Sequence, residues 1–170
     1  MSLLVAPDPT WPAIARAEAD RWRGLQLAGL VQVHHIGSTS VPGLPAKPII
    51  DLLPVFENLQ AADAARAELE TLGYEWMGPF GLPGRRYVRL DDPETGARRV
   101  QAHCYAAGSA EITRHLAFRD ALRANGMLRA AYTREKARCA QLHAGDTHAY
   151  GACKSAWIQK AEAKALDSYQ

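Results

Sequence analysis

The stretch "HHIGSTSVPGLPAKPIID", residues 34–51, decides the fold of this chain of 170 residues. It begins inside "LVQVHHIGS" (residues 30–38), which alternates apolar and polar residues before a glycine, a pattern that predicts a strand followed by a turn. It ends inside "PIIDLLPVF" (residues 48–56), an almost continuous apolar run typical of a central strand covered on both faces. Prolines and a glycine between them exclude a long helix. The sequence therefore predicts two strands joined by a stiff, irregular loop.

The rest of the chain alternates helix and strand and then becomes helical. Apolar spacing and end signals predict helices over 12–27, 59–72, 111–124, 128–142 and 147–166, and strands over 74–78, 86–90 and 98–105. The last two strands flank the turn signal "DDPETG" and form a predicted hairpin. We therefore expect an α/β (α+β) fold in a single domain, residues 1–170. Residues up to about 108 form a sheet core with helices, and about 109–170 form a C-terminal helical segment.

Composition excludes several classes of function. The net charge is only +2, with 20 Lys plus Arg against 18 Asp plus Glu. This excess is too small to favour nucleic acid or an anionic membrane as partner, so any anion site must be local. No apolar run approaches the roughly 20 residues of a membrane helix. The stretch "MSLLVAPDPTWP" lacks a positive region followed by a continuous apolar run, so we do not expect it to act as a signal sequence. The three cysteines are odd in number and lack C-x-x-C spacing. We therefore expect buried thiols, no disulfide framework and a reducing cytoplasm.

A glycine-serine turn follows the first predicted strand. Backbone amides and a hydroxyl at Gly37, Ser38 and Thr39 would face a phosphate, because successive amides in a tight turn form an anion-binding concavity. The alternative is that these residues merely cap a turn. Asp51 lies inside the second apolar strand, where an unpaired carboxylate costs several kcal/mol unless it meets a cation, a donor or solvent. Asp51 is therefore expected to be a ligand or a charge partner.

Basic residues supply a second indication of an anion site. Lys47, just before Asp51, could reach the glycine-serine turn. Tyr132 with Lys136, and Tyr150 with Lys154, each place a ring and an ammonium one helical turn apart on one face. The alternative for each lysine is a packed aliphatic stem with its charged head in solvent.

Four blocks carry a resemblance to a known family: "HIGSTSVPGLPAKPIID" (35–51), "LAFRDALR" (116–123), "YTREK" (132–136) and "YGACKSAWI" (150–158). Together they resemble the GrpB family over nearly the whole chain. That family is similar to the nucleotidyltransferase superfamily, in which a Gly-Ser turn holds a triphosphate and strand carboxylates hold two magnesium ions. The resemblance implies a mixed β-sheet of nucleotidyltransferase type with flanking helices. It also implies a link to coenzyme A biosynthesis, because a similar domain is fused to dephospho-coenzyme A kinase in some bacteria.

The carboxylate pattern departs from that superfamily. Two-metal chemistry requires carboxylates at positions i and i+2 of one strand. These side chains share a face of the strand and bind two ions about 4 Å apart. Here those positions are Asp51 and Leu53, and the later strand "VQAHCY" offers His103 but no acid. Related families often carry histidine at the position of Gln101 as well. A two-magnesium site is therefore not expected. An imidazole beside a carboxylate suits zinc or manganese, or direct proton transfer.

Three functions remain open after this comparison. The first is metal-assisted transfer of a nucleotidyl group from a nucleoside triphosphate to a small acceptor, with Mg²⁺, Mn²⁺ or Zn²⁺. The second is a non-catalytic module that binds a nucleotide or a coenzyme A-type phosphate, and a third reading is an interaction domain with a relic cleft. The predicted catalytic and metal residues are Asp51 and His103. The predicted phosphate- or nucleotide-binding residues are His35, Gly37, Ser38, Thr39, Lys47, Arg119, Lys136, Tyr150 and Lys154.

Two further assignments come from local pattern alone. Arg119 stands next to Asp120, and the alternative to a binding role is a local ion pair between them. His115, His143 and His148 show no metal-binding spacing, so we expect them at the surface or in packing.

Overall fold

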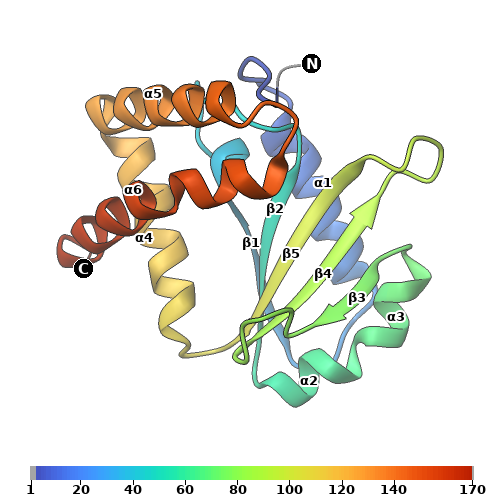
Figure 1. The fold of residues 1–170 in the computed structure, drawn as a ribbon. Helices are drawn as coiled ribbons and strands as arrows, with labels where there is room; N and C mark the ends of the chain where they lie inside the picture. Colours follow the sequence, from blue (N-terminus) through green and yellow to red (C-terminus); the bar gives the residue numbers. More distant parts are fainter. Residues whose placement is uncertain (1–2, 170) are drawn as a thin grey trace.

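The structure is a computed structural model that describes residues 3–169. Its centre is a five-stranded sheet in the order β1-β2-β5-β4-β3 (Figure 1). The strands are β1 Leu30–Ile36, β2 Ile50–Phe56, β3 Glu75–Gly78, β4 Arg85–Asp91 and β5 Arg98–Ala106. β2 and β5 run parallel and the other neighbouring pairs run antiparallel, which makes the sheet mixed. The predicted strands and hairpin are confirmed.

Helices cover both faces of this sheet. They are α1 Trp11–Gly24, α2 Leu59–Ala64, α3 Arg66–Thr71, α4 Ala110–Ala124, α5 Gly126–Leu142 and α6 Thr147–Asp167. The single helix predicted over 59–72 is instead two short helices that meet at Ala65, which is the C-cap of α2 and the N-cap of α3. Figure 1 shows α4, α5 and α6 gathered beside β1 and β2. Among residues 3–169, no helix combines the length and apolar character that a bilayer span requires.

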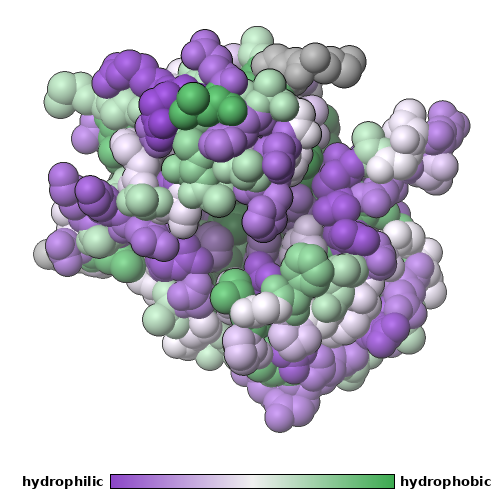
Figure 2. Space-filling model, viewed as in Figure 1, coloured by the Kyte–Doolittle hydropathy of each residue, from purple (hydrophilic) through white to green (hydrophobic). Residues whose placement is uncertain are grey.

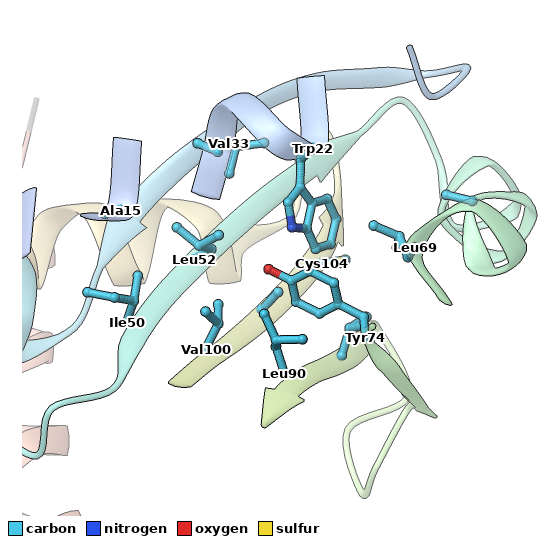
Figure 3. Close-up of a cluster of buried hydrophobic side chains, with 14 of the residues drawn as sticks. Ala15, Trp22, Val33, Ile50, Leu52, Leu69, Tyr74, Leu90, Val100 and Cys104 are labelled. Carbon is cyan, nitrogen blue, oxygen red and sulfur yellow. The ribbon is translucent and has the colours of Figure 1, made fainter. Parts of the chain in front are cut away.

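The main core lies between the sheet and the helices α1, α2 and α3. Trp22 is completely buried and meets the ring of Tyr74 edge-on, with the ring centroids 5.2 Å apart (Figure 3). The Tyr74 hydroxyl donates to the buried carboxylate of Glu18 at 2.7 Å, which satisfies that acid inside the core. Cys104 lies in the same core as a buried free thiol, as predicted.

The register of β2 places Asp51 at the end of the sheet and Leu53 inside it. Asp51 pairs with Ile36 on β1 and with Gln101 on β5. Because strand side chains alternate, Leu53 shares the face of Asp51. Leu53 is fully buried in the second core, with Ile36 and Tyr105 among its members and two residues of α4 packed against it. The position of a second metal-binding carboxylate is therefore part of an apolar core.

One prediction about the cysteines is wrong. Cys139 of α5 and Cys153 of α6 form a disulfide, with their Cα atoms 5.8 Å apart. Only a short turn, residues 143–146, separates the two helices, so the end of α5 and the beginning of α6 lie side by side. Counting cysteines and searching for C-x-x-C spacing missed this pair, because a helical hairpin joins positions 14 residues apart.

Candidate functional site

Most of the predicted site residues line one small pocket. Its volume is about 100 Å³, and it opens where the turn after β1, the start of β2 and the helices α5 and α6 meet. The residues that line it are Ser38, Thr39, Ala46, Lys47, Ile49, Asp51, Gln101, Lys136, Tyr150 and Lys154. Segments more than 100 residues apart in sequence thus supply a hydroxyl-bearing turn, one carboxylate and three lysines to one place. We call this space the lysine pocket.

The glycine-serine turn forms one wall of the pocket. Residues Ser38–Ser40 form a single 3₁₀ turn, in which the Ser40 amide donates to the Gly37 carbonyl at 3.1 Å. Gly37 itself has φ 72° and ψ −173°, a backbone conformation that is almost exclusive to glycine. A Cβ at this position would lie 2.6 Å from Oδ2 of Asp51. Glycine therefore allows the turn and the carboxylate to approach each other closely.

Replacing Gly37 by alanine will cost more stability than the same change at Gly43. Both glycines have positive φ, but a Cβ at Gly43 would meet no atom within 4 Å. Gly43→Ala therefore measures conformational strain alone, about 1–2 kcal/mol. Gly37→Ala adds the clash with Asp51, for which we expect a further ~1–3 kcal/mol. Urea denaturation of the two variants checks this difference, and equal losses would show that Asp51 is free to move away.

Lys136 is the most deeply buried charge of the pocket. Its side chain is 2% exposed, and its Nζ donates to Ser38 Oγ at 2.8 Å and to the Pro45 carbonyl. Burial, together with the neighbouring charge of Lys154, lowers the pKa of Lys136 to about 7. Such a lysine exchanges its proton near neutral pH, and an anion in the pocket would favour the charged form.

The ring of Tyr150 lies close to the other two lysines of the pocket. The Nζ of Lys154 lies 4.3 Å from the centre of its ring, and the Nζ of Lys47 lies 5.2 Å from it. Burial is the main cause that lowers the pKa of Lys154 to about 8, and burial also lowers the pKa of Lys47. The Tyr150 hydroxyl is buried and has no hydrogen-bond partner within residues 3–169. The pocket therefore holds excess positive charge and an unpaired donor, both of which suit an oxyanion.

Asp51, near the start of β2, lies close to His103, which is inside β5. Nε2 of His103 is 3.5 Å from Oδ1 of Asp51, and the ring of Tyr87 flanks His103 with the centroids 5.5 Å apart. His103 does not line the lysine pocket; Gln101, which pairs with Asp51 across the sheet, does.

These residues do not fit a two-magnesium centre. Asp51 is the single carboxylate of the lysine pocket, and Leu53 occupies the position of the second. Among residues 3–169, the group of three potential metal ligands that lie close together is on α5 and α6, not here.

Two predicted binding residues, His35 and Arg119, do not line the lysine pocket. The ring of His35 is 2.9 Å from the Thr39 hydroxyl, and burial lowers its pKa to about 4, so the ring is neutral at pH 7. Arg119 donates to the His35 carbonyl at 3.2 Å and also pairs with Asp120 at 2.8 Å. The local ion pair is thus present, and Arg119 additionally holds the end of β1 against α4.

A second pocket adjoins the first and shares Ser38, Asp51 and Lys154 with it. Its volume is about 210 Å³. The residues that line it are Gly37, Ser38, Asp51, His115, Phe118, Arg119, Leu122, Tyr132, Lys154, Ile158 and Glu162. We call it the mixed pocket, because its wall alternates charged and apolar side chains. Figure 2 shows both hydrophilic and hydrophobic residues around the recessed surface beside α6.

His115 and Glu162 line the mixed pocket but were not among the predicted site residues. His115 packs near the rings of His103 and Tyr105, in agreement with its expected place at the surface or in packing. Arg114 contacts both His115 and Glu162, with Nη2 at 3.2 Å from His115 Nε2 and Nη1 at 2.6 Å from Glu162 Oε1. Burial lowers the pKa of His115 to about 3 and raises the pKa of Glu162. The spacing Lys154, Ile158, Glu162 is one turn per step on α6, a signal that could have extended the site beyond Lys154.

Comparisons with known proteins show the relationships of this chain. The family model described as "GrpB protein" matches residues 3–164. This chain belongs to the GrpB family. A crystal structure of conserved protein GrpB from Enterococcus faecalis is 40% identical, covers 98% of each chain and has a TM-score of 0.89. UPF0157 protein BH1888 from Halalkalibacterium halodurans is 36% identical over 92% of this chain and 78% of its own length.

The chain is also similar to two proteins that are not named GrpB or UPF0157. A protein named dephospho-CoA kinase from Mycolicibacterium paratuberculosis is 32% identical over 96% of this chain. The chain spans 46% of that relative and 44% of UPF0157 protein YqkA from Bacillus subtilis, which is 34% identical. The Cid1 poly(U) polymerase structure with Mg 3'-dATP bound has a TM-score of 0.58 at 15% identity, over 88% of this chain and 49% of that chain. The GrpB fold is therefore of nucleotidyltransferase type, as predicted.

Proposed function

We propose that this GrpB protein binds a phosphorylated small molecule, a nucleotide or a coenzyme A-type compound, with the phosphates in the lysine pocket. The observation that carries this proposal is the charge balance of that pocket, in which three lysines face a single carboxylate. Burial depresses the pKa of Lys47, Lys136 and Lys154, so their charges are costly until an anion pairs with them. Ser38 and the unpaired hydroxyl of Tyr150 add polar contacts.

The mixed pocket would hold the organic part of the same ligand. Its charged residues are Asp51, Glu162, Arg119 and Lys154, which balance one another, so it does not favour a second anion. The apolar residues Phe118, Leu122 and Ile158 supply contacts for a ring or an alkyl group. Asp51 stands between the two pockets and would face the bond that joins phosphate to the organic group.

Metal-assisted nucleotidyl transfer to a small acceptor is the second candidate. It is supported by the contact between Asp51 and His103 and by the fold shared with Cid1. One carboxylate and one imidazole would hold one ion, Mg²⁺, Mn²⁺ or Zn²⁺, with other ligands from the nucleoside triphosphate. A link to coenzyme A rests on the relatives named dephospho-CoA kinase. A cytoplasmic setting, without nucleic acid or membrane partners, belongs to the same proposal.

Asp51→Asn distinguishes the two candidates. Titration calorimetry with pyrophosphate, ATP and coenzyme A, with and without divalent ions, measures the affinities. A binding module will take up these ligands without metal, and Asp51→Asn will leave that affinity equal or higher, because it removes a negative charge from an anion site.

A nucleotidyltransferase will instead bind ATP more tightly with the metal, and Asp51→Asn will abolish that gain. Asp167→Asn, which changes an exposed carboxylate at the end of α6, is the matched control. No binding of any of the three ligands by the unaltered protein would contradict both candidates.

A further inference from the structure

The disulfide between Cys139 and Cys153 joins α5 and α6 close in sequence to two residues of the lysine pocket. Cys139 follows Lys136 by three residues on α5, and Cys153 is the neighbour of Lys154 on α6. The disulfide thus joins the two helix segments that bring these lysines to the pocket. The flanking α6 residues at positions 151, 152, 155 and 156 are exposed, so this end of α6 gains little packing from them.

The surroundings of the two sulfurs favour thiol–disulfide exchange. Nη2 of Arg138 is 3.5 Å from Sγ of Cys139 and 3.4 Å from Sγ of Cys153. A guanidinium at this distance stabilises a thiolate, which is the leaving group of the exchange. Cys153 is partly exposed whereas Cys139 is fully buried. An external thiolate would therefore attack Sγ of Cys153 and release Cys139 as a thiolate beside Arg138.

A metal centre explains the same cluster less well. Ligand atoms of Glu135, Cys139 and Cys153 lie within 4.8 Å of one another, a grouping that could hold a soft ion. Arg138 already pairs with Glu135 at 2.6 Å and faces both sulfurs. A metal cation would have to displace this guanidinium or tolerate its charge, whereas a thiolate intermediate benefits from it.

We propose that the Cys139–Cys153 disulfide is a site of reversible thiol exchange that controls anion binding in the lysine pocket. The control rests on the proposed function, whereas the exchange itself does not. A dithiol reductant supplies two electrons and two protons; it leaves as a cyclic disulfide, and both protein sulfurs become thiols. A small-molecule disulfide reverses the reaction and leaves as two thiols. Reduction removes the covalent link between α5 and the start of α6 and leaves the stacking of Trp157 on Tyr132 in place. We expect Tyr150 and Lys154 to be held less firmly opposite Lys136 as a result.

The test compares oxidised and dithiothreitol-reduced protein in a Cys104→Ser background, which removes the third thiol. We expect thiol titration to find no reactive thiol before reduction and two after it. We expect faster amide hydrogen exchange over residues 147–158 after reduction, and about tenfold weaker pyrophosphate binding, as expected for loss of one charge-assisted contact. Oxidised glutathione should restore both properties. A variant with both Cys139→Ala and Cys153→Ala should resemble the reduced protein and ignore dithiothreitol.

The measurements distinguish a failure of the thiol-exchange proposal from a failure of the proposed anion binding. Free thiols that persist in oxidised glutathione, or hydrogen exchange over 147–158 that reduction does not change, would show that the disulfide is not an exchangeable link. Unchanged pyrophosphate affinity in protein that does bind pyrophosphate would show that the link does not control the pocket. Absence of pyrophosphate binding in both states, with faster hydrogen exchange on reduction, would contradict the proposed function and the control of binding but leave the exchange site standing.

Discussion

Lys136→Met will weaken pyrophosphate binding by about 10–100-fold. Its ammonium is fixed between Ser38 Oγ and the Pro45 carbonyl, so it meets a bound anion without being reoriented. A charge-assisted hydrogen bond is worth about 1.5–3 kcal/mol, which corresponds to that range of affinity. Methionine keeps most of the length of the side chain and removes only the charge and the donors. Titration calorimetry at about pH 6, where the lysine is charged, measures the loss.

Lys160→Met is the matched control, since Lys160 is exposed on α6 and lines neither pocket. We expect its affinity to stay within twofold of the unaltered protein. Thermal melts of both variants must remain cooperative, because Lys136→Met leaves two oxygen atoms without their buried partner. If the folded Lys136→Met variant binds pyrophosphate with full affinity, the anion does not bind beside Lys136.

Anion affinity will fall by roughly 100-fold between about pH 6 and pH 9. Burial lowers the pKa of Lys136 to about 7 and that of Lys154 to about 8, so both ammoniums are charged at the lower pH and largely neutral at the higher one. A bound anion raises both pKa values, and binding near pH 8 should therefore take up protons. Sulfate is the suitable probe, because its own charge is constant over this range.

Calorimetry in two buffers of different ionisation enthalpy measures this proton uptake. Lys136→Met should remove the part of the pH dependence that is centred near pH 7 and leave the part near pH 8. The folding stability of the ligand-free protein should change with pH in the opposite direction to the anion affinity. The unfolded chain holds protons on these lysines up to their ordinary pKa near 10.5, so stability should rise with pH above about 7. An affinity that is flat from pH 6 to 9 would contradict the assignment of both lysines.

Local patterns were sufficient for the strands, the turn and the family. The alternation up to Gly37 and the apolar run around Asp51 depend on backbone period and burial, which a sequence displays directly. Family blocks then indicated Lys136 and Lys154, and the structure places both in one pocket with Lys47. Their roles in binding stay predictions.

Long-range packing accounts for what the sequence did not predict. His115 and Glu162 come together through Arg114, from α4 and α6, and a pattern within either helix does not show which faces meet. The disulfide likewise depends on how α5 folds back onto α6. His103 was predicted as a catalytic and metal-binding residue together with Asp51. The structure places the two side chains 3.5 Å apart but leaves His103 outside the lysine pocket, and its role stays a prediction.

Leu53 also limits how this protein could change over time. An aspartate there would have to ionise inside an apolar core beneath α4, beside Ile36 and Tyr105. A single substitution that introduced this acid would first destabilise the folded protein. Any benefit from metal binding would come only afterwards. Smaller or polar side chains on α4 would have to come first, or together with the acid, because neighbouring substitutions do not act independently. Within this fold, Leu53 makes it difficult to gain the second carboxylate by one substitution.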